Sequence, residues 1–150
     1  MSIEIYKNLY FKLPFEIQKV IDSYVDPEYD YYIDKVREVE KEYQIHYGGF
    51  YKKPLFLPER HSFTMNSIKN IVKCIQEIPF IIKRMKTHKS KYAVGSYGGK
   101  HAIEHYRRIK NPKENSYISN GEFIIAMILL DYIPKVESLN CRFNAVYIHK

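Results

Sequence analysis

Residues 123–130, Phe-Ile-Ile-Ala-Met-Ile-Leu-Leu, form the longest uninterrupted apolar run of the chain. Ser119-Asn120-Gly121 precedes it and Asp131 follows, which predicts a helix over 120–131. A helix that is apolar on every side has to be buried, so the rest of the chain must pack around this one. At eight residues, the run is far shorter than the roughly 20 that a membrane-spanning helix needs.

The composition is that of a folded globular protein. The chain has 150 residues, of which 45% are hydrophobic and 27% charged, as expected for one domain. Cys74 and Cys141 have no partner at disulfide-framework or metal-ligand spacing, so we expect buried thiols in a reducing compartment. The start, Met-Ser-Ile-Glu-Ile-Tyr-Lys, carries an acid where a signal peptide would be apolar. We therefore expect a soluble intracellular protein.

Charge is distributed unevenly along the chain, although the formal net charge is +7. Residues 1–50 hold ten acidic and six basic side chains, a net charge of −4. Residues 51–100 hold eleven basic and two acidic side chains, a net charge of +9, and residues 101–150 add +2. Such asymmetry favours a protein in which one segment faces a polyanion and another has a different role.

The acidic segment 1–50 predicts a hairpin of two helices. A helix over 14–25 is indicated by an apolar stripe at helical spacing: Leu13, Ile17, Val20, Ile21 and Tyr24. Asp26-Pro27-Glu28 then has the pattern of a helix start. The second helix, acidic over 28–46, has Tyr29, Tyr32, Ile33, Val36 and Tyr43 on one face, and Gly48-Gly49 ends it. The short connection makes the two helices antiparallel neighbours.

The remaining residues predict two further units. Residues 51–92 read as a proline-containing loop and a basic helix over 64–77, kinked or restarted at Pro79 and carried onward to Met85. Residues 93–150 read as a helix over 97–109, the buried helix, and two strands, 132–137 and 143–149, joined around Asn140. This is the order of winged-helix modules. We predict one compact α+β domain, mainly α-helical, in which the N-terminal hairpin packs with a winged-helix-like module.

The helix over 97–109 is the best candidate for a binding surface. Its predicted buried stripe is Gly99, Ala102, Ile103, Tyr106 and Ile109. The opposite face then carries Lys100, His101, Glu104, His105, Arg107 and Arg108, nearly all of them donors that suit phosphates. With the basic run 83–91, the predicted nucleic-acid-binding residues are Lys83, Arg84, Lys86, Lys89, Lys91, Lys100, His101, Arg107, Arg108 and Lys110. The alternative is an ordinary solvated helix surface.

Tyrosines near basic residues add to this interpretation. Tyr47, Tyr51, Tyr92 and Tyr97 lie in glycine-containing loops, where their rings can stack on unpaired bases. The alternative for each is plain loop packing. The helix predicted to be buried, 120–131, has no polar side and so cannot be the recognition helix of a winged-helix protein.

Two motifs suggest catalysis only on a superficial match. His101-Ala-Ile-Glu104-His105 fits the HxxEH pattern of inverted zinc metallopeptidases, which are far larger and need a distant third ligand. Gly95-Ser-Tyr-Gly-Gly-Lys100 is one residue short of a P-loop, and His101 stands where the magnesium-binding Ser or Thr belongs. We predict no catalytic residues, no metal and no cofactor.

Two stretches resemble known families. Residues 96–101, Ser-Tyr-Gly-Gly-Lys-His, with Glu104, then 117–124, Tyr-Ile-Ser-Asn-Gly-Glu-Phe-Ile, and Leu139-Asn140 to Asn144, resemble a small domain of uncharacterised proteins from large DNA viruses and phages. The resemblance covers the last 55 residues and implies no catalytic residues. Those relatives have a bulkier residue at the position of Gly99. Residues 13–24, from Leu13-Pro14, resemble an F-box opening, without the later F-box signature.

These observations predict a non-catalytic viral protein that binds the backbone of DNA or RNA in the host cytoplasm, a virus factory or the virion core. The alternative is a viral interaction, assembly or adaptor protein whose basic face meets an acidic partner. The acidic helix 28–46 is a second candidate surface for a protein partner. A metal-dependent hydrolase built on HxxEH is the remaining hypothesis.

Overall fold

The computed structural model describes residues 9–25, 28–51, 63–85 and 93–148. Its helices are α2 (Phe15–Val25), α3 (Glu28–Tyr43), α4 (Met65–Glu77), the 3-10 helix η2 (Ile78–Phe80), α5 (Ser96–Lys110) and α6 (Asn120–Leu129). Its strands are β1 (Ile45–His46), β2 (Gly49–Phe50), β3 (Ile82–Arg84), β4 (Val94–Gly95), β5 (Pro134–Glu137), β6 (Asn140–Phe143) and β7 (Ala145–Tyr147). The fold is mixed α and β, mainly helical with small antiparallel sheets, as the sequence predicts.

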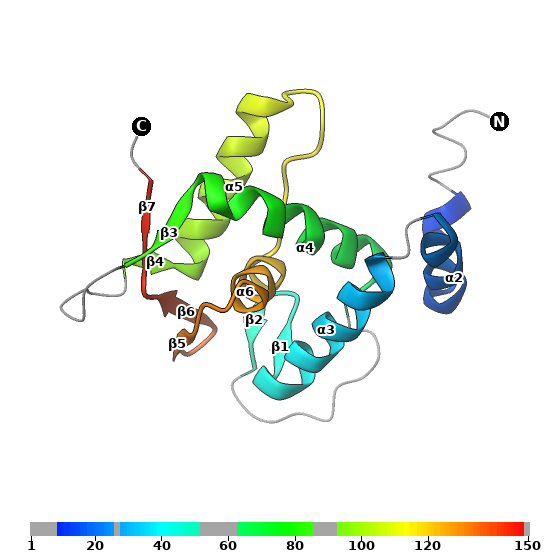
Figure 1. Ribbon diagram of the computed structural model, residues 1–150, viewed down its shortest axis with the longest axis horizontal. Helices are drawn as coiled ribbons and strands as arrows, with labels where there is room; N and C mark the ends of the chain where they lie inside the picture. The colour runs from blue at the N-terminus through cyan, green and yellow to red at the C-terminus, as the bar shows by residue number, and fades with distance from the viewer. Residues whose placement is uncertain (1–8, 26–27, 52–62, 86–92, 149–150) are drawn as a thin grey trace.

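Helix α6 lies at the centre of the fold, with α3, α4 and α5 packed against it (Figure 1). Every residue from Asn120 to Met127 is buried, which confirms the burial predicted for the apolar run. A capping box closes its N-terminus, where the Ser119 hydroxyl accepts from the Glu122 N–H at 3.0 Å and the Glu122 carboxylate accepts from the Ser119 N–H at 2.8 Å. The apolar run therefore organises the core as well as occupying it.

Helix α4 begins and ends where its sequence indicates. The Thr64 hydroxyl caps it by accepting from the Ser67 N–H at 3.2 Å, and Met65, Ile68 and Ile71 are fully buried. Pro79 lies in η2, where the α-helix has ended. The predicted helical continuation to Met85 is wrong, because residues 82–84 form β3 and pair antiparallel with β7.

Two of the three small sheets in the described residues contain the C-terminal strands β5, β6 and β7. Strands β4, β6 and β5 form one sheet in that order, and β5 and β6 form a hairpin whose second strand is residues 140–143 and not the predicted 143–149. Its turn is at 138–139, with Ser138 at a φ of 63°, rather than around Asn140. The predicted strand 143–149 is not continuous, because β6 pairs with β5 whereas β7 pairs with β3.

Helix α2 buries a different face from the one predicted. On α2, Ile17 and Val20 are exposed, so the predicted apolar stripe is wrong at both positions. Gln18 and Asp22 are buried instead, because the Gln18 amide donates to the Leu13 carbonyl at 2.9 Å and the Asp22 carboxylate pairs with Lys69 of α4 at 3.0 Å. Polar partners therefore bury part of α2, alongside its apolar residues Phe15 and Ile21, which pack against the core.

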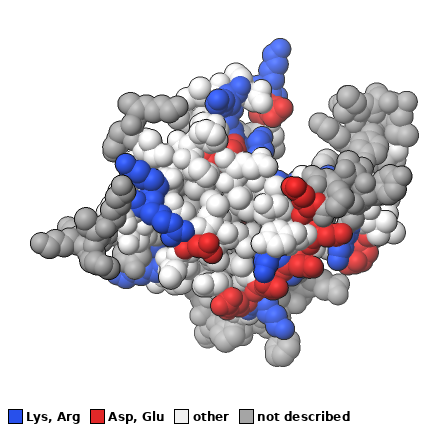
Figure 2. All heavy atoms as spheres, viewed as in Figure 1, with Lys and Arg blue, Asp and Glu red and all other residues white. Residues whose placement is uncertain are grey.

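Helix α3 buries Ile33 and Val36 as predicted, and its acidic side chains gather at the lower right of the face shown in Figure 2. It ends at Tyr43, earlier than the predicted glycine stop, and a short hairpin of β1 and β2 follows. Gly49 has a φ of 134°, and a Cβ there would lie 2.2 Å from the Leu139 carbonyl oxygen, so no other residue fits.

The two cysteines, Cys74 and Cys141, are free and buried, as predicted. Burial raises the pKa of the Cys141 thiol to about 12, so it remains protonated. Within the described residues, no helix is both long enough and apolar enough to cross a membrane.

Candidate nucleic-acid interface

The predicted binding face of α5 is in large part not a surface. Lys100 and Arg107 are only 8% and 4% exposed, and Glu104 is buried beside them. The prediction that these residues face solvent is therefore wrong. The buried side of α5 is turned by about a quarter of a helical turn from its apolar stripe, and Ile109 of that stripe is 68% exposed.

Lys100 and Glu104 are buried because they satisfy each other. The Lys100 ammonium donates to the Glu104 carboxylate at 2.8 Å and to the Ile118 carbonyl at 2.9 Å. Burial disfavours the charged form of Glu104, but hydrogen bonds from Lys100 and His101 outweigh it and lower the pKa of the carboxyl group. A buried ion pair with its hydrogen bonds complete is tolerated where a single buried charge is not.

Arg107 joins α5 to α4 and to the segment that follows α5. Its Nε donates to the Glu77 carboxylate at 2.8 Å, and its Nη2 lies 2.7 Å from the same group. Its Nη1 donates to Asn70 Oδ1 at 2.6 Å and to the Tyr117 carbonyl at 3.2 Å. This guanidinium holds the fold together and does not point toward a partner.

The other predicted contacts differ in position. His101, Arg108, Lys110, Lys83 and Arg84 are exposed. Arg84 is engaged within the chain, since it donates to the Leu130 carbonyl at 2.6 Å and lies over the Tyr132 ring. Lys86, Lys89, Lys91 and Tyr92 lie outside the described residues.

The two motifs that suggested catalysis are used for packing. Glu104 of HxxEH is held by Lys100, and no three His, Cys, Asp or Glu residues within the described ranges form a group that fits a metal ion. Lys100 of the P-loop-like stretch turns inward to Ile118 instead of toward the helix N-terminus. Gly99 lies against α6, where a Cβ would come within 2.3 Å of Phe123 Cζ, and this contact accounts for the missing side chain.

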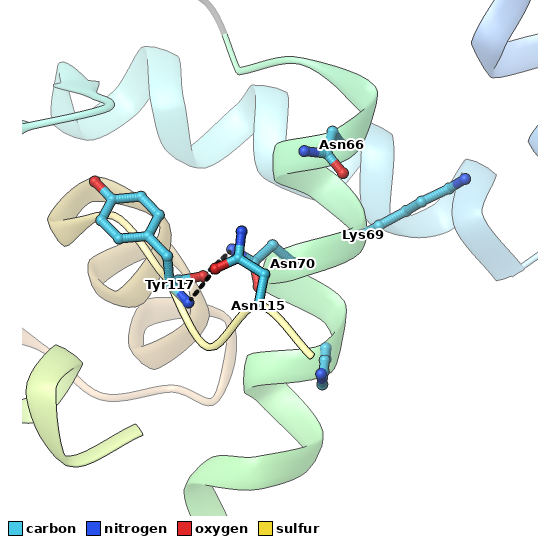
Figure 3. Close-up of a pocket in the computed structure, with 6 residues that line it drawn as sticks. Asn66, Lys69, Asn70, Asn115 and Tyr117 are labelled. Atoms are coloured by element: carbon cyan, nitrogen blue, oxygen red, sulfur yellow. Dashed lines mark hydrogen bonds between the residues drawn. The ribbon is translucent and has the colours of Figure 1, made fainter. Parts of the chain in front are cut away.

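A polar pocket that the sequence analysis did not identify lies between α4 and the segment after α5 (Figure 3). Asn66, Lys69, Asn70 and Lys73 fall at i, i+3, i+4 and i+7 and so share one side of α4. Asn115 and Tyr117 complete a cavity of about 250 Å³. The described residues that line it are amides, lysines and a tyrosine, with no carboxylate among them.

Several of these groups are fixed before any ligand arrives. Asn70 Nδ2 donates to the Tyr117 carbonyl and to Glu122, each at 3.1 Å, while its Oδ1 accepts from Arg107. The Tyr117 N–H donates to Asn115 Oδ1 at 3.0 Å. The buried charges of α5 thus form the support beneath the pocket.

The two lysines of the pocket are arranged differently. Lys69 extends away from the other labelled side chains toward α2, where it pairs with Asp22, so only its stem lines the cavity (Figure 3). Lys73 pairs with Glu114 at 3.6 Å, and both side chains are well exposed. An exposed pair of this kind contributes little stability, so Lys73 can exchange its partner for a phosphate.

Two tyrosines lie next to the pocket. The rings of Tyr47, from the β1–β2 turn, and Tyr117 are 6.4 Å apart at 35°, and both side chains are about half exposed. Burial raises the pKa of the Tyr47 hydroxyl, and the charge of Glu122 raises it further, so this ring remains neutral. Of the other predicted tyrosines, Tyr51 packs on His46, and Tyr97 is exposed with its ring edge-on to His101.

Comparison of the chain with family models, with curated proteins and with solved structures finds no match. The pocket, with the half-exposed tyrosines at its edge, combines an opening, donors, acceptors and partly exposed rings.

Proposed function

We propose that the protein is a non-catalytic nucleic-acid-binding protein whose α4 pocket holds one nucleotide of a single strand. The observation that carries this proposal is the pocket between α4 and residues 115–117, with three carboxamides, a lysine and an adjoining tyrosine pair. Asn66 and Asn115 offer the kind of group that reads base edges, because a carboxamide both donates and accepts. Asn70, whose Nδ2 and Oδ1 are engaged within the chain, holds the Tyr117 backbone in place. Lys73 is placed to contact a phosphate.

An unpaired strand suits this site better than a duplex. Carboxamides at the floor of a pocket can reach the hydrogen-bonding edge of a base only where that edge is not already paired. The half-exposed rings of Tyr47 and Tyr117 can likewise stack on bases that have left a helix. DNA and RNA are both compatible with these groups.

The surrounding charge supports the same proposal. The chain has a pI of about 9.2, and exposed cations lie in the last turn of α5, at Arg108 and Lys110, and just beyond it at Lys113. The segment that carries Lys113 descends from the end of α5 beside α4 to α6 (Figure 1). A positive field at this end would speed the approach of a polyanion.

The proposal also changes the winged-helix-like interpretation. The order α5, α6, β5, β6 is that of a winged-helix module, and the resemblance to a domain of viral proteins covers the same residues. In our proposal the binding surface belongs to α4 and to residues 115–117, because α6 is enclosed by the core. The viral setting remains part of the proposal and rests on the sequence resemblance alone.

A binding titration with matched variants tests the proposal. Labelled oligouridine, oligodeoxythymidine and a DNA duplex are titrated at about 50 mM salt and upward. We expect Lys73→Gln to weaken single-strand binding about three- to tenfold and to reduce the slope of log K against log salt by about 0.7. Lys12→Gln removes the same charge from an exposed position of the acidic segment and should leave both quantities nearly unchanged.

A second pair of variants in the same assay tests stacking. Tyr117→Leu should weaken binding by about fivefold or more, since a base stacked on an aromatic ring contributes about 1–3 kcal/mol. Tyr97→Leu, an equally exposed tyrosine on α5, is the control. Absence of single-strand binding, or equal losses in each variant and its control, would contradict the proposal and indicate diffuse electrostatics.

A further inference from the structure

A second, apolar groove runs along the opposite side of α5 from its buried charges; we call it the α5 groove. It is lined by Phe80 and Ile81 near η2, by Tyr106 and Ile109 of α5, and by Tyr147 and Ile148 at β7. Its volume is about 360 Å³, within the range of roughly 300–1,000 Å³ that is usual for ligand sites.

The groove exists because α5 buries its polar side. The apolar stripe at Ala102, Tyr106 and Ile109 is left facing outward, and Ile109 and Phe80 are 68% and 62% exposed. The rings of Phe80 and Tyr106 lie almost parallel, at 11° and 6.4 Å, and form a continuous wall. A gathered apolar patch on a small protein marks an interaction surface more often than single exposed residues do.

The charge that the groove residues themselves carry is the positive charge of Lys110. Lys110 lies over the Tyr106 ring at 5.7 Å, and His105 lines the groove on the neighbouring turn. Arg108 extends from the exposed side of the same helix. Of the described residues that line the groove, none is acidic. The surface therefore complements a ligand that is apolar at its centre and acidic at its flanks.

We propose that the α5 groove docks an acidic amphipathic helix of a partner protein. The stripe from residue 102 to residue 109 spans about two helical turns, or roughly 10 Å, which matches anchors at i, i+3 or i+4, and i+7 of a docked helix. The acidic helix of this chain, α3, already buries its apolar residues Ile33 and Val36, so it does not supply those anchors. This proposal does not depend on the proposed binding of nucleic acid.

Selection from a displayed library of random 16-residue peptides tests the proposal with a defined probe. We expect the selected peptides to carry apolar residues at helical spacing and an excess of Asp and Glu. Ile109→Ser should weaken the best synthetic peptide at least tenfold, and Lys110→Glu should weaken it severalfold. Ile133→Ser, at a residue 77% exposed outside the groove, and Lys12→Glu are the matched controls and should have little effect. Every variant changes an exposed side chain, so folding should be retained, and circular dichroism checks this.

Three outcomes would overturn the proposal. One is a selection whose peptides lack acids or bind the Ile109→Ser variant equally well. Another is a lower sedimentation coefficient for the Ile109→Ser variant than for the unmodified protein, both measured without peptide. A second copy of the chain would then be the occupant of the groove. The third is displacement of the bound peptide by oligouridine to the same extent in the unmodified protein and in the Lys73→Gln variant. The groove itself would then be a nucleic-acid site. Peptide binding that survives Lys73→Gln supports the groove even if the proposed function fails.

Discussion

On the core side of α5, Lys100, Glu104 and Arg107 are buried, whereas on its groove side Tyr106 and Ile109 meet solvent. The two sides differ in what their neighbours supply. Glu77 of α4 and the Ile118 carbonyl satisfy the charged groups of the core side. On the apolar side, the described residues that face α5 are those of η2, Ile81 and the end of β7, and they leave a groove.

This difference shows that hydrophobicity alone does not decide which side of a helix is buried. A buried charge is costly when unpaired, but a fully hydrogen-bonded network can occupy a core and fix one arrangement of its elements. The network of α5 then leaves apolar area on the outside, where it is available to a partner. The orientation of α5 about its own axis therefore accounts for both the buried charged network and the exposed apolar area.

The largest change in stability is expected within a pair of adjacent arginines, Arg107 and Arg108. Arg107→Ala should lower the free energy of unfolding by about 3–5 kcal/mol, because the buried Glu77 carboxylate loses its partner. Arg108→Ala, on the exposed side of the same turn, should change it by less than about 0.5 kcal/mol. Urea unfolding followed by circular dichroism measures both. Similar values for the two variants would mean that the buried network does not determine the orientation of α5.

A smaller effect is expected at two adjacent glycines. In Gly99→Ala the new Cβ would lie 2.3 Å from Phe123 Cζ, and such overpacking costs about 1–3 kcal/mol. In Gly98→Ala the atom nearest to the new Cβ is the Tyr147 hydroxyl oxygen at 3.3 Å. The gain in helix propensity of up to about 1 kcal/mol should nearly offset the cost of a small shift of that hydroxyl. Thermal unfolding of the two variants gives the comparison. A Gly99→Ala protein as stable as Gly98→Ala would show that α5 is not held close to α6.

The sequence predicts those elements whose signal is local. The apolar run, the Ser119 cap and Asp131 together indicate where α6 lies, and Thr64 and Pro79 bound α4. The rotation of α5 could not be predicted, because the partner of Arg107 is Glu77, which belongs to another helix. The same reason applies to α2, where Asp22 is buried by Lys69 of α4.

The candidate site likewise combines features that the sequence predicts locally with contacts that depend on the tertiary fold. The spacing of Asn66, Lys69, Asn70 and Lys73 is visible in the sequence as a polar helix side, but it has no distinct meaning until residues 115–117 are placed opposite it. Tyr47 was a candidate from its loop context, whereas its neighbour Tyr117 is brought to it only by the tertiary fold. Local patterns thus predicted the types of group at the site but not which of them meet.

The last test compares two buried glutamates near the pocket, Glu104 and Glu122. Hydrogen bonds from Lys100 and His101 lower the pKa of Glu104 despite its burial, whereas burial raises the pKa of Glu122, whose partners Ser119, Ser67 and Asn70 are neutral. Glu104 therefore contributes stability above its ordinary pKa, and this contribution is lost as the pH falls through its lowered value. Glu122 acts in the opposite sense, since the folded state holds its proton more tightly, and stability falls as the pH rises through its raised value.

Isosteric amides convert this difference into a measurement. Glu104→Gln should lower stability at about pH 7, because Lys100 is left buried without a counter-charge, and the deficit should shrink only as the pH falls below the ordinary glutamate pKa. Glu122→Gln keeps an acceptor for the Ser119 N–H and removes the buried charge, so it should be as stable as the unmodified protein or more so at about pH 7, with the advantage vanishing in acid. Urea midpoints across this pH range give the sign for each variant. Equal losses of stability from the two glutamine variants at neutral pH would contradict this expectation. They would mean that the neutral donors around Glu122 stabilise its charged form as well as Lys100 and His101 stabilise that of Glu104.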